Sequence, residues 1–216
     1  MKNSKLIPAL LLALASFVTL NAQDATPSFQ EFLAQFPKAS LPYSFNAEDL
    51  KGQLETRPAA KAARLSWEFY AYLPELERSA SYSNMPVCPE PVAAFETKEY
   101  TAVLYNIARG FSRGTKTYSV TVYNKQGEYL GTHFVAGVNP ETLTVATISE
   151  TLSAQVNGYK VNWANNYREN GHINNKVTGL TLIETATVEL TSAGNPDQMD
   201  WASRDLNTSA DIAKIK

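Results

Sequence analysis

The stretch TYSVTVYNKQGEYLGTHFVAG, residues 117–137, decides the fold of this chain. Its first part alternates, with Tyr118, Val120 and Val122 on one side. This period of two is typical of a β-strand, whose successive side chains point to opposite faces. The turn sequence NKQG follows, and EYLGTHFVAG continues the pattern. The stretch therefore predicts two antiparallel strands joined by a tight turn.

Further strands are predicted on both sides of this hairpin. In YTAVLYNIA (residues 100–108) apolar residues occupy both the odd and the even positions, which indicates a strand covered on both faces. Asn157-Gly158 predicts a type I′ hairpin turn, because both central residues of that turn need a positive φ. ENG at 169–171 predicts another turn. The remaining strand candidates are ETLTVATI (141–148), ETLSAQV (150–156), YKVNWANNY (159–167) and VTGLTLIETATVEL (177–190).

The N-terminal part has a helical pattern instead. In SFQEFLAQF (28–36) one apolar stripe recurs at helical spacing, formed by Phe29, Phe32, Leu33 and Phe36. Ser28 and Glu31 predict a capping box at its start, and Pro37 marks its end. RPAAKAARLSWEFYAYL (57–73) is a second helical candidate, and KASLPYSF (38–45) between the two reads as extended chain.

Strands that follow one another without intervening helices exclude a parallel sheet. We therefore expect an α+β fold: an antiparallel β-meander sheet that is open, sandwich-like or partly closed, with short N-terminal helices packed on one face or end. The expected organisation is a signal peptide (1–22), a helical N-terminal segment (23–80), an antiparallel β domain (81–191) and a polar C-terminal tail (192–216).

The first residues predict export. Lys2 and Lys5 precede the uncharged apolar run of residues 6–20, and LNAQ follows it, with cleavage expected after Ala22. The alternative is a retained membrane anchor, for which the run is short. We expect a periplasmic or secreted protein without an integral membrane segment in the mature chain. With 19 Lys and Arg against 21 Asp and Glu, the charge argues against a nucleic-acid partner and against anionic membranes.

GFSRG (110–114) matches G-x-S-x-G, the nucleophile elbow of serine hydrolases, with Ser112 as its nucleophile. The elbow needs a helix directly after the serine, whereas TKTYSVTVY follows here and is β-branched and alternating. The chain also has no aspartate between Asp49 and Asp197. GFSRG is therefore interpreted as a loop between strands, with a serine hydrolase as an alternative.

No metal or cofactor is expected. NNYRENGHINNK (165–176) resembles a calcium loop only in its glycine, because acids are missing at its ligand positions, so its amides are expected to bond to their own turn backbone. His133 and His172 lack a second ligand at suitable spacing. Cys88 is the only cysteine, which excludes an internal disulfide. It is interpreted as a small buried residue, with an intermolecular bridge or a reactive thiol as the alternative.

Aromatic residues are the positive functional feature. Tyr159, Trp163 and Tyr167 are aligned and form a stacking platform if that sheet face is open. The competing interpretation is a core face, because Val161 lies between them. The expected ligand is an unknown glycan, peptide or protein.

Three stretches resemble a family: NAQ (21–23), FLAQFPKASLPYSF (32–45) and YNKQGEYLG (123–131). In these and in its layout the chain resembles small exported β-rich proteins of unassigned function from the envelopes of Gram-negative bacteria. The resemblance brings no catalytic motif, so it assigns no site residue. We expect an exported, non-enzymatic binding or interaction module. The alternatives are a serine hydrolase using Ser112 and a structural envelope subunit that pairs through an edge strand.

Overall fold

The computed structural model describes residues 27–55, 64–74, 76, 89–108, 116–171 and 175–193. In this part of the chain eight strands form one open sheet, and every strand pair is antiparallel. Seven of them are neighbours in sequence order: β2 (Pro89–Glu96), β3 (Tyr100–Ala108), β4 (Lys116–Asn124), β5 (Tyr129–Val138), β6 (Thr142–Ile148), β7 (Ser153–Trp163) and β8 (Val177–Glu189). The short β1 (Tyr43–Ser44) pairs with β6. The expected α+β fold with an antiparallel meander is confirmed.

Strand β3 is buried on both faces, as its sequence predicted. Ala102 and Leu104 belong to a large apolar cluster, the main core, whereas Val103, Tyr105 and Ile107 belong to a second core. Consecutive side chains of a strand point to opposite faces, so the two cores lie on opposite sides of this part of the sheet.

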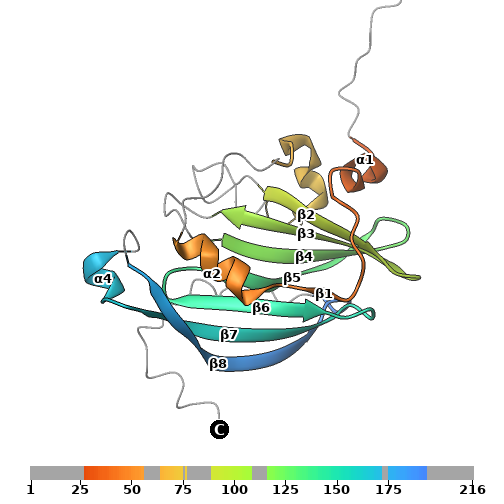
Figure 1. The fold of residues 1–216 in the computed structure, drawn as a ribbon. Helices are drawn as coiled ribbons and strands as arrows, with labels where there is room; N and C mark the ends of the chain where they lie inside the picture. Colours follow the sequence, from red (N-terminus) through yellow and green to blue (C-terminus); the bar gives the residue numbers. More distant parts are fainter. Residues whose placement is uncertain are drawn as a thin grey trace, which may run out of the picture.

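The helices are divided between these two faces. The five-residue α1 (Phe29–Leu33) and the 3₁₀ helix η1 (Trp67–Tyr72) pack on the second core through Phe32 and Phe69. Helix α2 (Ala47–Glu55) packs on the main core through Leu50 and Leu54 and contacts β5 and β6. Figure 1 shows α1 and η1 beside β2 to β4, while α2 lies across the strands at β5 and β6.

The start of α1 confirms the predicted capping box. The Ser28 hydroxyl accepts from the Glu31 N–H at 3.2 Å, and the Glu31 carboxylate accepts from the Ser28 N–H at 2.7 Å. Both bonds satisfy N–H groups that the first helical turn leaves without a partner. The Ser28 N–H and the Ser28 hydroxyl both donate to the Glu31 carboxylate, and they lower the pKa of this carboxyl because they favour its charged form.

The pairing within the sheet is shortest between β5 and β6 among its seven consecutive strands. These two strands pair only at Gly137 with Thr144 and at Val138 with Leu143. One edge of β6 is paired with β7 along its whole length. The pairing with β1 is therefore on the other edge, the one that β6 also uses for β5. Beyond these two pairs with β5, segment 43–45 therefore completes the hydrogen bonding of β6, and the Phe45 N–H donates to the Ala146 carbonyl at 2.9 Å.

Two local features differ from the sequence-based expectations. The predicted turn at Asn157-Gly158 is wrong: both residues lie in the middle of β7, between β6 and β8. Pairing on both sides outweighs the turn preference, and a register shift between β7 and β8 lies directly after Gly158, as is common for a glycine inside a strand. Helix α2, which the sequence did not single out, covers the main core.

Several expectations concern residues outside the described part. These are the signal peptide (1–22), most of the first half of the second helical candidate (57–63), Cys88, GFSRG with Ser112, His172 and the tail from 194 onward. Within the described residues, no helix combines the length and the apolar character that crossing a membrane requires.

Phe32 is expected to be essential for the attachment of α1. Its side chain is 0 % exposed and packs against five other aromatic rings: Phe29, Phe36, Phe69, Tyr72 and Tyr123. Phe32→Ala should lower the free energy of unfolding by about 3–5 kcal/mol, because it removes a buried ring and leaves a cavity. Urea unfolding followed by circular dichroism measures this. Trp67→Ala is the control, since Trp67 is 79 % exposed and its loss should change stability by less than about 0.5 kcal/mol. Equal effects would contradict the assignment of the second core.

Candidate functional site

The structure brings two of the three predicted aromatic ligand-binding residues together. Trp163 at the end of β7 and Tyr167 in α4 (Tyr167–Asn170) have ring centroids 5.2 Å apart. Tyr159 lies further along β7, opposite Leu143 and Leu182. All three rings are half-buried.

Their contacts explain this burial. Tyr159 and Trp163 pack against the main core, and the Trp163 indole N–H donates to the Pro140 carbonyl at 2.6 Å. Burial, with a smaller contribution from the Glu141 carboxylate, raises the pKa of the Tyr167 hydroxyl. A ligand-stacking role for these rings stays a prediction.

The amide-rich segment near α4 satisfies its own backbone, as predicted. Asn166 Oδ1 accepts from the Arg168 N–H at 3.1 Å, and Asn175 Oδ1 accepts from the Asn165 N–H at 3.0 Å. The Asn175 amide also donates to the carbonyls of Asn165 and Gly171. The described part of the chain contains no group of three or more His, Cys, Asp or Glu residues that could hold a metal ion.

His133 is a buried residue of β5, 5 % exposed. Its Nε2–H donates to the Ser192 carbonyl at 3.1 Å, which ties β5 to the segment that follows β8. Burial lowers the pKa of the imidazole, although the carbonyls of Ser192 and Leu190 act in the opposite direction. The neutral ring is therefore the form that the folded state favours.

This burial predicts a pH dependence of stability. A histidine whose pKa is lower in the folded state stabilises the fold above its unfolded pKa of about 6.5, and this stabilisation is lost as the pH falls through the lower, folded value. Wild type should thus lose more stability on acidification below pH 6.5 than His133→Gln, whose amide can still donate to Ser192 but does not titrate. Chemical unfolding at several pH values tests this; parallel curves would contradict it.

A polar row crosses the sheet on the side of the main core. Glu90, Asn106 and Tyr118 are cross-strand neighbours on β2, β3 and β4. Lys116 Nζ lies 3.5 Å from the Glu90 carboxylate, and Gln53 of α2 reaches the Tyr118 hydroxyl. Asn106 Oδ1 is buried without a hydrogen-bond partner in the described structure.

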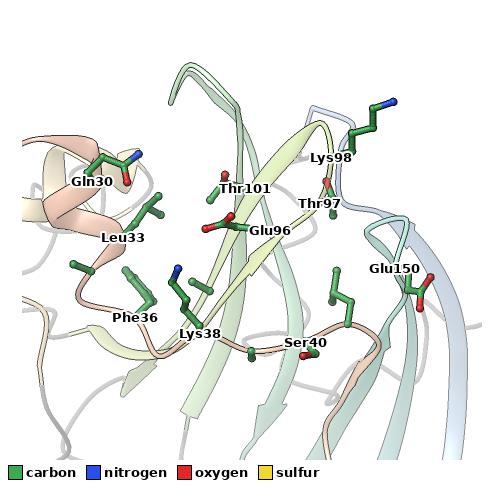
Figure 2. A pocket seen from close by; sticks show the side chains of 14 residues that line it. Gln30, Leu33, Phe36, Lys38, Ser40, Glu96, Thr97, Lys98, Thr101 and Glu150 are labelled. Atoms are coloured by element: carbon green, nitrogen blue, oxygen red, sulfur yellow. The ribbon is translucent and has the colours of Figure 1, made fainter.

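A cleft of about 960 Å³ lies beside β2. One wall is α1 with the chain that follows it, and the other is the tip of the β2–β3 hairpin (Figure 2). The turn between β6 and β7 contributes Glu150 at the far end. This volume lies in the range of small-molecule binding sites, which is about 300–1,000 Å³.

The cleft has an apolar base and a polar rim. Leu33 and Phe36 project from the α1 side, and Phe36 is 4 % exposed. Glu96 and Thr101, which are cross-strand partners, face them from the hairpin. The other polar side chains of the rim are Gln30, Lys38, Ser40, Thr97, Lys98 and Glu150.

Four charged side chains line the cleft: Lys38, Lys98, Glu96 and Glu150. The ion pairs of the described structure join other residues, namely Lys51 with Glu48, Lys116 with Glu90 and Arg168 with Glu141. The four cleft charges thus have no ion-pair partner within the described part of the protein. Two cations and two anions remain available to a ligand that carries both signs.

Sequence reasoning did not find this cleft, because its residues come from three distant parts of the chain. Only the stripe with Leu33 and Phe36 gave a signal, and that stripe was interpreted as the buried face of a helix. Lys38 and Ser40 lie in the segment predicted as extended chain, and Glu96 directly precedes the hairpin tip.

Comparisons with known proteins add nothing to this geometry. No protein-family model, no curated protein and no solved structure matches the chain.

Proposed function

We propose that this protein is an exported, non-enzymatic binding protein whose ligand occupies the cleft between α1 and the β2–β3 hairpin. One observation carries the proposal: a cleft of about 960 Å³ with an apolar base and charged groups of both signs that have no ion-pair partner among the described residues. Binding sites commonly combine an apolar lining with a few polar groups that orient the ligand. Export is supported by the sequence of residues 1–22.

A thermal-shift screen tests this function. The panel contains oligosaccharides, peptides, lipids and divalent ions. A ligand that binds only the folded state stabilises it by about 2.7 kcal/mol at a hundred times its dissociation constant. We expect one class to raise the melting temperature of wild type but not of Lys38→Glu, which reverses a charge in the cleft.

Lys160→Glu is the matched control, because Lys160 is an exposed lysine of β7 that does not line the cleft. It should respond to the ligand as wild type does. A ligand that stabilises all three proteins equally binds elsewhere and would contradict the proposed site. A panel without any shift would contradict a role in binding these ligand classes.

The edge of β8 favours a second candidate function, a structural subunit that adds this strand to a partner. Among the described strands β8 pairs only with β7, and its Leu182 and Ile183 are 55 % and 51 % exposed. Exposed edge strands are sites of pairing with other chains. Light scattering coupled to size exclusion tests this candidate: a monomer at high concentration that captures nothing from an envelope extract would argue against it.

The serine hydrolase remains the enzymatic alternative, and Ser112 lies outside the described residues. Labelling by a fluorophosphonate that disappears in Ser112→Ala would replace the binding function with this activity. We expect no labelling of either protein.

A further inference from the structure

One wall of the cleft is the outer edge of β2. Some main-chain groups of this edge already form hydrogen bonds with another segment. The Ala94 N–H donates to the Pro37 carbonyl at 2.7 Å, and the Ala94 carbonyl accepts from the Ala39 N–H at 2.9 Å. Lys38 thereby forms a parallel bridge with Ala94. For this one step of the ladder, segment 37–39 acts as a neighbouring strand of β2.

The next outward-facing residue of β2 is Glu96. Main-chain groups of a strand alternate in direction, so the N–H and carbonyl of Glu96 point the same way as those of Ala94, away from β3. The hairpin closure agrees with this alternation, because the Thr97 N–H donates inward to the Tyr100 carbonyl at 2.9 Å. Glu96 therefore directs one donor and one acceptor into the cleft.

The chain that pairs with Ala94 does not continue to Glu96. No main-chain hydrogen bond joins Glu96 to residues 39–41 in the described structure. Instead, Ala39, Leu41 and Tyr43 pack against the main core on the other side of the sheet. The cleft opens where this segment leaves the edge, so none of the described residues forms a main-chain hydrogen bond with Glu96 on this side.

We propose that the ligand is a short extended peptide segment that pairs with the main chain of Glu96, in line with segment 37–39. This inference rests on the proposed binding function of the cleft. One N–H of the ligand would donate to the Glu96 carbonyl, and one ligand carbonyl would accept from the Glu96 N–H. Strand addition of this kind takes its affinity from main-chain bonds and its specificity from pockets for side chains.

The lining of the cleft fits a peptide better than a glycan. Among the described residues that line it, Phe36 alone is aromatic and is 4 % exposed, so these residues present no open ring face on which a sugar could stack. The apolar base at Leu33 and Phe36 suits an aliphatic side chain of the ligand. Lys38 and Lys98 suit its acidic groups, and Glu96 and Glu150 suit its basic groups.

The experiment starts from a library of linear octapeptides selected on the full chain. Binders that lose affinity with Lys38→Glu but not with Lys160→Glu are assigned to the cleft. Each amide of one such peptide is then N-methylated in turn, which removes the donor without changing the side chain. We expect one position to weaken binding about tenfold, the effect of one lost hydrogen bond with its partner left unsatisfied, and its neighbours to matter much less.

A pair of protein variants tests the same bond from the other side. Glu96→Pro removes the outward N–H and no hydrogen bond of the sheet, since proline is tolerated on an edge strand when its nitrogen faces outward. Glu96→Ala keeps the N–H and removes the same carboxylate. We expect Glu96→Pro to bind the selected peptide about tenfold more weakly than Glu96→Ala. Circular dichroism and the melting temperature verify that both variants are folded. If Glu96→Pro does not fold, the N-methyl scan on wild type is by itself the test of main-chain pairing.

The outcomes separate the two proposals. If the binding of the peptides depends on Lys38 but N-methylation weakens it at no position, main-chain pairing is overturned and the cleft remains the binding site. A library without binders, together with a non-peptide compound whose thermal shift depends on Lys38, would overturn the peptide class alone. If neither peptides nor compounds depend on Lys38, the binding function of the cleft fails with it.

Discussion

The burial of β3 on both faces is the constraint on which the rest of the structure depends. A strand with Val103 and Tyr105 on one side and Ala102 and Leu104 on the other needs an apolar cover on each face. The sheet itself cannot supply both covers, so the N-terminal segment is divided between them. Helix α1 and η1 cover one face, and α2 covers the other. The chain must therefore pass from one side of the sheet to the other between α1 and α2, and it does so along the edge of β2.

This crossing also creates the candidate site. Segment 37–39 protects the edge of β2 at Ala94, and the Leu65 N–H bonds to the Pro89 carbonyl at the other end of the strand. Both contacts blunt an edge that would otherwise be open to pairing with foreign strands. Among the described residues this protection ends at Glu96, because residues 39–45 turn toward the main core. The crossing of the chain along the edge of β2 thus explains the composition of the site. It brings an unpaired main-chain position among the described residues together with an apolar base and four charges.

The two sites considered for binding differ in how visible they are in the sequence. Tyr159, Trp163 and Tyr167 stand out because they are large and regularly spaced, yet their rings are half-buried against the main core or against each other. The cleft residues have no common pattern, since Lys38, Glu96 and Glu150 are ordinary surface residues when each is seen alone. Only their convergence makes a site. Asn157-Gly158 shows the same limit in the fold, because a strong local turn signal yields to strand partners on both sides.

The sequence by itself determined the local elements. Alternation predicted β3, β4, β5 and β8, the Ser28–Glu31 pair predicted the start of α1, and NKQG predicted the β4–β5 turn, in which Gly127 has a φ of +83°. Each of these depends on neighbours within a few residues, where side-chain period and backbone hydrogen bonding are encoded directly. The tertiary structure alone decided which face each helix covers, where β5 separates from β6, and that no described residue pairs with the edge of β2 at Glu96. These features depend on packing between segments far apart in the chain, for which a local pattern carries no information.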